Sequence, residues 1–219
     1  MELTVNVFTT LDGVMQAPGA PEEDTAGGFR HGGWLGPYAD QGMGEIVERW
    51  FADADAVLLG RRTYQAMAGY WPRVDDDGST TWRVLNTGPK YVVSTTLAAA
   101  AADWANSTVI GTDILARVSE LKRASGRELQ VHGSWRLIQT LHEAGLVDAY
   151  RLLVFPTSVG GLGKRVFADG STPTGFTVSE VQVTESGIVA MTLRPEEFRQ
   201  AGVAVVDGKD SVVELAQPV

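Results

Sequence analysis

The chain has 219 residues, with 18 Lys plus Arg against 27 Asp plus Glu, a net charge of −9, and no cysteine. An acidic surface repels phosphate backbones, and a chain without cysteine forms no disulfide or thiolate site, so we expect neither a nucleic-acid partner nor cysteine chemistry. No apolar run approaches the roughly 20 residues of a membrane span, and the start of the chain lacks a signal-peptide pattern. We therefore expect a cytoplasmic protein with no membrane partner.

The first part of the chain alternates strand-like and helix-like patterns. Residues 3–8 alternate apolar and polar side chains, which predicts a half-buried strand. Residues 16–42 are rich in glycine, proline and acids, which predicts a long loop of the functional or mobile kind. Apolar residues at helical spacing follow over 43–54. The apolar run 56–59, ended by Gly60, then predicts a fully buried strand.

The remaining patterns continue this alternation and end in a hairpin. Helices are predicted over 63–69, around 81–85, over 114–121 and over 134–141. Thr112 or Asp113, and then Ser134, are the expected N-caps of the last two helices. Strands are predicted over 90–94, 107–111, 128–132 and 150–155. Two cleanly alternating segments, 176–183 and 188–193, predict a hairpin.

The order of these elements predicts a three-layer α/β fold. Alternating strands and helices favour a mostly parallel central sheet, and the terminal hairpin adds an antiparallel edge. No linker interrupts the chain before residue 195, so we expect one domain over 1–195 and a C-terminal extension over 196–219. The extension contains Asp207-Gly208 and is interpreted either as a short hairpin or as an arm that packs on a partner subunit.

The most informative junction lies where the second strand meets the next helix. The strand stops at Gly60, then come Arg61 and Arg62, and the helix opens around Thr63. Free amides and the positive dipole end of a helix N-terminus bind phosphate, and arginines add charge-assisted hydrogen bonds. The alternative is an ordinary tight turn with Thr63 as N-cap and solvated arginines, and the spacing alone leaves both interpretations open.

Two further junctions have the same design. One strand ends in the hydroxyl run Ser94-Thr95-Thr96, and another ends at Gly133-Ser134 before a helix. In isolation the favoured interpretation of the first is an ordinary hydroxyl-rich loop, and that of the second is a helix cap. Because ligands of open α/β sheets bind at the carboxyl ends of the strands, three such junctions together indicate an anion site. The standard glycine-rich nucleotide motifs are absent, and the spacing of the histidines predicts no metal site.

These junctions and several other segments carry a family resemblance over about residues 2–194. The chain resembles the dihydrofolate reductase-like superfamily, and within it stand-alone proteins similar to the reductase (RibD C-terminal) domain of bifunctional riboflavin biosynthesis enzymes. The matching segments are Leu11-Asp12-Gly13-Val14, His31-Gly32-Gly33-Trp34, Leu59 to Tyr64 with Tyr70-Trp71-Pro72, Lys90 to Thr95, Val131-His132-Gly133-Ser134 and Gly161 to Phe167.

The resemblance implies a reductase domain that binds NADPH, with a homodimer as the implied assembly. On this reading the segment Gly60, Arg61, Arg62 and Thr63 holds the pyrophosphate and the 2′-phosphate side of the cofactor. Ser94 and Thr95 flank the ribose phosphate of the adenosine. Gly133 and Ser134, with the amides of the following helix, bind the remaining phosphate oxygens.

Two carboxylates are candidates for the catalytic side. Dihydrofolate reductases place one carboxylate on the first long helix, and the nearest here is Glu45, with Glu48 one turn later. For both, the favoured alternative is a solvated surface carboxylate. Asp12 follows the first strand, where the nicotinamide lies in such folds. It is a candidate for orienting a substrate or donating a proton through water, or it is simply part of an Asp-Gly turn.

Aromatic and basic residues are the candidates for substrate binding. Trp34, Tyr70 and Trp71 have the flat faces that stack on a heterocycle, or they cover the core. Lys164 lies in a basic, glycine-rich loop at 160–165 that is suited to a substrate phosphate, or that is a surface turn.

The leading hypothesis is an NADPH-dependent oxidoreductase acting on a flat heterocyclic substrate. Its best-named activity is the pyrimidine reductase step of riboflavin biosynthesis, of the 5-amino-6-(5-phosphoribosylamino)uracil reductase type. Dihydrofolate or pterin reduction is the second activity within this class. The rival is a non-catalytic NADPH-binding sensor or assembly protein, which the C-terminal extension and the poorly matched carboxylate favour.

Overall fold

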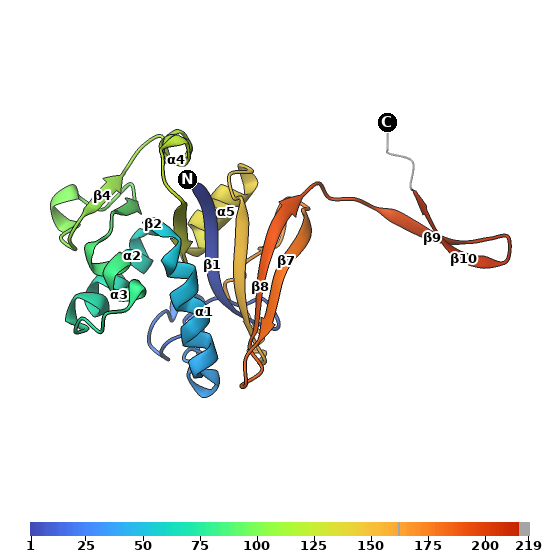
Figure 1. The fold of residues 1–219 in the computed structure, drawn as a ribbon, viewed down its shortest axis with the longest axis horizontal. Helices are drawn as coiled ribbons and strands as arrows, with labels where there is room; N and C mark the ends of the chain where they lie inside the picture. Colours follow the sequence, from blue (N-terminus) through green and yellow to red (C-terminus); the bar gives the residue numbers. More distant parts are fainter. Residues whose placement is uncertain (162, 215–219) are drawn as a thin grey trace.

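An eight-stranded sheet with the order β4-β3-β2-β5-β1-β6-β8-β7 forms the centre of the protein (Figure 1). The computed structural model describes residues 1–161 and 163–214; Leu162 of the glycine-rich loop and residues 215–219 of the extension lie outside this range. The strands of the sheet are β1 (Glu2–Thr10), β2 (Ala54–Gly60), β3 (Lys90–Val93), β4 (Ser107–Ile110), β5 (Glu128–His132), β6 (Ala149–Phe155), β7 (Gly175–Val183) and β8 (Val189–Glu196).

Strand directions confirm the predicted sheet. Strands β1 to β6 pair in parallel, and β8 then pairs antiparallel with both β6 and β7. The hairpin expected from the alternation of 176–183 and 188–193 is therefore the antiparallel edge of the sheet.

Helices cover both faces of the sheet, which completes the expected three layers. They are α1 (Gln41–Ala52), α2 (Arg61–Tyr70), α3 (Thr80–Thr87), α4 (Ile114–Arg123) and α5 (Trp135–Glu143), with single 3-10 turns η1 (Ala26–Gly28), η2 (Gly36–Tyr38), η3 (Trp71–Arg73) and η4 (Ala99–Ala101). On one face α4 and α5 pack over β1, β5 and β2 through Val118, Ile138 and Leu141. On the other face α1, α2 and α3 cover the sheet with Ile46, Tyr64 and Leu85. The chain thus buries its parallel strands from both sides.

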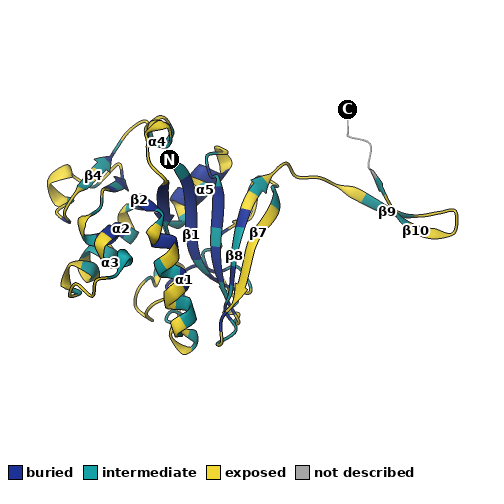
Figure 2. Cartoon of the chain, viewed as in Figure 1, coloured by how far each residue is buried: buried dark blue, intermediate teal, exposed yellow. Residues whose placement is uncertain are grey.

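The prediction of a half-buried first strand is wrong. The alternation is real, but the polar residues Thr4 and Asn6 of β1 are as buried as the apolar ones. Figure 2 shows β1 coloured mostly as buried. β1 lies between β5 and β6 in the middle of the sheet, and α1 covers the face that carries the polar residues. A sequence alternation indicates two chemically different faces, but it does not tell whether the polar face meets water.

The C-terminal extension forms the predicted hairpin as a separate two-stranded sheet of β9 (Ala201–Val206) and β10 (Lys209–Glu214). Its turn residues Asp207 and Gly208 both have positive φ, as tight two-residue hairpin turns require. Figure 1 shows this hairpin projecting away from the body of the protein. Among the described residues, no helix has the length and apolar character needed to cross a membrane.

Candidate functional site

The first and third junctions of the sequence analysis meet at the carboxyl ends of two neighbouring strands. β2 pairs in parallel with β5, so Gly60 and Ser134 lie side by side. The Ser134 Oγ accepts a hydrogen bond of 2.7 Å from the backbone amide of Gly60 and donates one of 2.9 Å to the Thr63 Oγ1. One hydroxyl group therefore connects the β2–α2 junction to the β5–α5 junction.

Close packing at this contact requires glycine at position 60. A Cβ atom on Gly60 would lie only 3.0 Å from both the Cβ and the Oγ of Ser134. Gly133 and Ser134 both have positive φ, which turns the chain sharply between β5 and α5. The backbone conformation therefore holds the two helix starts against each other.

The capping predictions need correction at both helices. α2 begins at Arg61 rather than at Thr63, with Gly60 in the N-cap position. Ser134 occupies the N-cap position of α5 as predicted, but its side chain bonds the neighbouring junction instead of its own helix. Neither helix start carries a side-chain cap, so both keep the positive dipole end that favours an anion.

The second junction joins the same edge through Arg61. The Arg61 Nη1 donates a hydrogen bond of 2.7 Å to the Thr96 Oγ1 in the loop after β3. Ser94 is buried, and its Oγ accepts hydrogen bonds from the amides of Thr96 and Leu97 at 3.2 and 2.9 Å, while Thr95 is exposed. Ser94 thus shapes the loop, and Arg61 connects that loop to the α2 terminus.

The long loop between β1 and α1 is paired with the glycine-rich loop, and the positive charge of Arg62 acts on it. The Asp24 carboxylate in that loop forms an ion pair with the Lys164 ammonium of the glycine-rich loop. Burial raises the pKa of Asp24, but the hydrogen bonds from Lys164 and the Ala26 amide and the positive charges of Lys164 and Arg62 lower it below its usual value. The ion pair therefore joins the two loops to each other, within electrostatic reach of Arg62.

Asp12 fastens the glycine-rich loop to the end of β1. Its carboxylate accepts hydrogen bonds from the Thr10 hydroxyl at 2.6 Å, the Gly160 amide at 2.8 Å and the Val159 amide at 3.3 Å. Burial raises the pKa of Asp12, but these hydrogen bonds outweigh it and lower the pKa. The group is an ionised acceptor at neutral pH and a poor proton donor.

The other predicted substrate residues lie in different surroundings. Trp34 is buried, donates its Nε1 hydrogen to the Gln16 carbonyl at 2.9 Å and packs edge-on against Phe155. Trp71 is half-buried at the end of α2, with the exposed ring of Tyr70 packed edge-on against it. Trp34 therefore supports the long loop, and Trp71 retains some accessible surface.

The carboxylates of α1 are exposed or bind other elements. Glu45 is exposed and accepts a hydrogen bond from the Gln41 side chain. Glu48 binds the amides and the hydroxyl at the start of α3, at Thr80 and Thr81. Burial raises the pKa of Glu48, but these hydrogen bonds lower it by more, so the pKa lies below its usual value. The group therefore acts as a structural anion.

A buried polar network beneath α1 is the feature that sequence reasoning missed. On β5, Gln130 donates to the Trp50 carbonyl and to Glu128, both at 2.6 Å. Arg151 on β6 binds both oxygens of Glu128 at 2.7 and 2.8 Å. The signal was the alternation of Glu128, Gln130 and His132 on a central strand, which places three polar groups on one face.

His132 and Asn6 lie at the end of this network nearest the junctions. They are paired neighbours on β5 and β1, and the His132 ring stacks on Phe51 at 4.5 Å. Burial, and then the positive charge of Arg151, lowers the pKa of His132 to about 3, so the ring is neutral at neutral pH. Both polar atoms of the Asn6 side chain are buried, and neither has a hydrogen-bond partner among the residues that the structure describes. Buried amides are nearly always paired, which makes Asn6 a candidate contact for a bound molecule.

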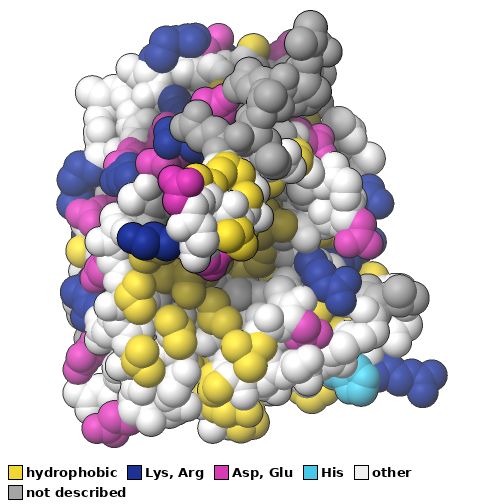
Figure 3. Space-filling model, turned by 90° about the vertical axis from the view of Figure 1, so that its right-hand side faces the viewer, with side chains coloured by type: hydrophobic (Ala, Val, Ile, Leu, Met, Phe, Trp, Pro, Cys, Tyr) yellow, Lys and Arg dark blue, Asp and Glu magenta, His cyan; other side chains and the backbone are white. Residues whose placement is uncertain are grey.

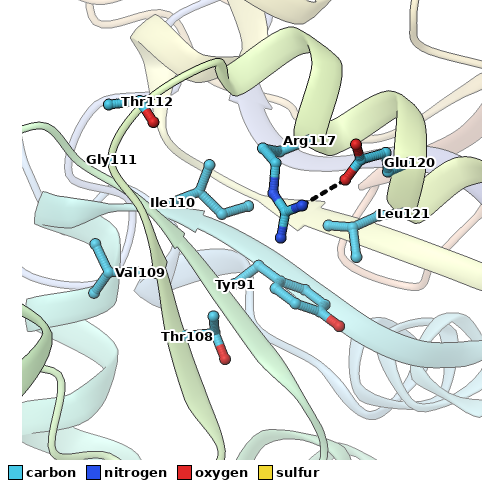
Figure 4. Close-up of a pocket in the computed structure, with 9 residues that line it drawn as sticks. All are labelled: Tyr91, Thr108, Val109, Ile110, Gly111, Thr112, Arg117, Glu120 and Leu121. Carbon is cyan, nitrogen blue, oxygen red and sulfur yellow. Dashed lines mark hydrogen bonds and ion pairs between the residues drawn. The ribbon is translucent and has the colours of Figure 1, made fainter.

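A cavity of about 250 Å³ adjoins the Ser94 loop. It lies between α4 and the strands β3 and β4, on the face of the sheet opposite α1. The Ser94 amide donates to the Ile110 carbonyl at 3.1 Å, and Ile110 lines this cavity. Figure 4 shows the Arg117 side chain extending from α4 across the cavity, paired with Glu120 at 2.6 Å. An aromatic ring, Tyr91, lies on the opposite wall.

Fold and junctions together define an α/β protein of the dihydrofolate reductase-like class. The chain matches the family model of the RibD C-terminal domain over residues 1–190, and it belongs to that family. This match confirms the family resemblance that the sequence motifs indicated.

Individual relatives agree with this assignment. Uncharacterized protein YyaP of Bacillus subtilis is 29% identical over 190 residues, covering 85% of this chain and 91% of YyaP. A Shewanella sp. PV-4 structure with a provisional riboflavin biosynthesis name superimposes with a TM-score of 0.68 and 18% identity, over 90% of this chain and 100% of that one. A pyrimidine reductase-like protein of Corynebacterium diphtheriae superimposes with a TM-score of 0.63 and 13% identity, over 90% of this chain and 92% of that one. At these identities the two structures show a common fold.

Substituting Gly60 with alanine tests the close contact between the two junctions. The added Cβ meets Ser134, and overpacking of this kind costs about 1–3 kcal/mol of unfolding free energy. Gly44→Ala is the matched control, because nothing lies within 4 Å of its Cβ position inside α1, and alanine there stabilises the helix by about 0.5–1 kcal/mol. Urea unfolding measures both values.

Ser134→Gly provides the reciprocal check, because it removes the atoms that the new Cβ would meet. The double variant Gly60→Ala/Ser134→Gly should be less destabilised than the sum of the two single variants. A Gly60→Ala protein as stable as Gly44→Ala would show that the junctions are not in tight contact.

Proposed function

We propose that this protein is an NADPH-dependent reductase of a flat heterocyclic substrate, of the type that carries out the pyrimidine reductase step of riboflavin biosynthesis. The observation that carries the proposal is the convergence of three strand ends on one edge, joined by the Ser134 hydroxyl and by Arg61. Membership of the RibD C-terminal domain family supports a reductase rather than another use of the fold.

The donors at this edge suit a dinucleotide phosphate in number and kind. Two guanidinium groups, Arg61 and Arg62, stand in the first turn of α2, and the start of α5 lies beside them. In the proposed complex Gly60 to Thr63 bind the pyrophosphate and the 2′-phosphate side, Ser94 and Thr95 the ribose phosphate, and Gly133 with Ser134 the remaining oxygens. NADPH, when bound, supplies a hydride to the substrate.

The net charge of −9 does not oppose this assignment. A single cofactor needs a few local amides and cations, whereas a nucleic acid needs an extended basic surface. The cavity beside Ser94, with Tyr91 and Arg117 on its walls, is the proposed place for the adenine end of the cofactor.

The substrate half of the proposal uses the end of β1 and the two loops above it. Asp12, ionised and held by two backbone amides, orients the glycine-rich loop against the reacting groups, and protons reach them through water. Lys164 is the proposed contact for a substrate phosphate, released from Asp24 when substrate binds. Trp71 is the proposed stacking surface, with Trp34 as support beneath the loop.

Two other functions are weighed against this one. Dihydrofolate or pterin reduction relies on a carboxylate from the first long helix, and here Glu45 is exposed and Glu48 holds α3. The positions of Glu45 and Glu48 also favour the other alternative, a non-catalytic NADPH-binding sensor or assembly protein. They leave α1 without a free carboxylate that faces the sheet.

Turnover against a panel of substrates separates these functions. NADPH oxidation is followed by its loss of absorbance with phosphoribosylaminopyrimidines, pterins and dihydrofolate as substrates. We expect oxidation with the aminopyrimidines. Turnover restricted to pterins would support dihydrofolate-type reduction, and tight NADPH binding without any turnover would support the sensor.

Replacing both arginines of the α2 terminus tests how the cofactor is recognised. Arg61→Ala/Arg62→Ala should weaken NADPH binding at least tenfold and NADH binding less, because the guanidiniums face the 2′-phosphate. Isothermal titration with each cofactor measures the ratio. Arg83→Ala, an exposed arginine of α3, is the matched control and should leave both affinities unchanged. Equal losses for NADPH and NADH would contradict the assigned role.

Asn6→Leu tests whether the unpartnered amide serves a ligand. Leucine has a similar volume and removes a buried polar group that has no partner, so the free protein should be as stable as the wild type or more stable. Substrate or cofactor affinity should fall by about tenfold if a hydrogen bond to Asn6 is lost. Thermal unfolding with and without NADPH measures both effects, and a stability loss without any change in binding would assign Asn6 a purely structural role.

A further inference from the structure

The glycine-rich loop holds Arg165 in a fixed place. Arg165 and Val14 form an isolated antiparallel bridge between this loop and the segment that follows β1. Beside the bridge, the Val166 amide donates to the Gly13 carbonyl at 3.1 Å. From α5, the Gln139 side chain donates to the carbonyls of Val166 and Arg165 at 2.5 and 3.4 Å. A neighbouring extended segment and a helix therefore both fix the backbone at Arg165.

The side chain of Arg165 lies across the turn at Asp12 and Gly13. Its Nε donates a hydrogen bond of 3.1 Å to the Asp12 carbonyl. Gly13 has a positive φ, and the Arg165 Cδ lies 3.9 Å from the place that a Cβ on Gly13 would take. Arginine has N–H donors on its Nε and on both Nη atoms. The Nη donors make no hydrogen bond to the residues that the structure describes, so this end of the fork is free to bind a ligand.

The half-buried guanidinium of Arg165 also lacks a counter-ion within the described part of the chain. The Asp12 carboxylate is occupied by the Thr10 hydroxyl and by two backbone amides of the glycine-rich loop. The adjacent cation, Lys164, is paired with Asp24. A charged group that is already held in position loses little freedom when it binds an anion, so Arg165 is prepared for one.

Arg165 stands apart from the edge where β2 and β5 end, which is the proposed site of the cofactor pyrophosphate. β1 pairs with β5 as far as Asn6 and His132 and then continues from Asn6 to Thr10. This continuation is roughly 13 Å long at about 3.3 Å per residue, and the turn under Arg165 follows it. A pyrophosphate at the β2–β5 edge therefore does not reach Arg165. An anion bound there belongs to the molecule that meets the other end of the cofactor, which is the substrate.

The end of the sheet at β7 has the opposite character. Figure 3 shows hydrophobic side chains gathered at this end of the molecule, and Val178, Val181 and Val183 of β7 are exposed. An anionic group gains no favourable contact from such a surface. The glycine-rich loop is therefore the better place for an anionic part of the substrate.

We propose that Arg165 binds a phosphate group of the substrate through its two Nη atoms, and that it thereby selects phosphorylated heterocycles over unphosphorylated ones. The inference rests on the proposed function for the kind of substrate and adds a residue to the substrate site. A phosphate monoester carries nearly two negative charges at neutral pH. The loop supplies two adjacent cations for it, Arg165 directly and Lys164 after its release from Asp24. A carboxylate would engage only one of them.

Ribose 5-phosphate is the probe that tests this site without turnover. Isothermal titration of the full chain should show binding of ribose 5-phosphate and no binding of ribose. Arg165→Met keeps the stem that lies on Gly13 and should weaken ribose 5-phosphate binding by about tenfold or more, because the charge-assisted hydrogen bonds are lost. Arg165→Lys keeps the charge without the fork and should lose less. Arg199→Met, which changes an exposed arginine between β8 and β9, is the matched control.

The arginines of the α2 terminus separate the two anion sites. Arg165→Met should leave NADPH affinity unchanged, and Arg61→Ala/Arg62→Ala should leave ribose 5-phosphate affinity unchanged. The proposal is overturned if the wild type does not bind ribose 5-phosphate, if Arg165→Met binds it as the wild type does, or if its affinity follows Arg61 and Arg62 instead.

Turnover then connects the site to the substrate. With an aminopyrimidine riboside and its 5′-phosphate, Arg165→Met should raise KM for the phosphate by about tenfold and leave kcat nearly unchanged, because the contact is equal in the ground and transition states. The riboside should be reduced as by the wild type. An equal loss for both substrates would show a structural role and overturn the proposal. If neither compound is reduced, the proposed function fails, whereas the ribose 5-phosphate titration still decides the role of Arg165.

Discussion

A single hydroxyl group, the Oγ of Ser134, holds the candidate site together. It accepts the amide hydrogen of Gly60 and donates to the Thr63 hydroxyl, so it bonds two strand–helix junctions to each other. The contact exists because β2 and β5 are neighbouring parallel strands whose carboxyl ends meet at one edge. Without it the junctions would be separate turns; with it, two uncapped helix starts form one surface suited to phosphate.

Local arrangement, rather than overall charge, decides what this acidic chain can bind. Arg61 and Arg62 stand at the α2 terminus, and the positive charge of Arg62 acts on Asp24, which forms an ion pair with Lys164. Asp12 ties the glycine-rich loop to the first strand through backbone amides. The proposed cofactor and substrate regions are therefore joined by short hydrogen-bonded connections between loops that lie far apart in the sequence.

The fold class and the three junctions could be predicted because both depend on local patterns, such as a glycine at the end of an apolar run. The bond between Gly60 and Ser134 could not, because it joins residues 74 positions apart and depends on strand order. The buried polar network was misjudged for a related reason. The alternation that contains Asn6 reveals a polar face, but only the position of α1 shows that this face is covered.

The structure of the protein crystallised with NADPH tests the central claim most directly. We predict that the pyrophosphate lies at the edge formed by Gly60 to Thr63 and Gly133-Ser134, with the 2′-phosphate beside Arg61. NADPH bound elsewhere on the protein, or this edge left empty at saturating NADPH, would contradict the account.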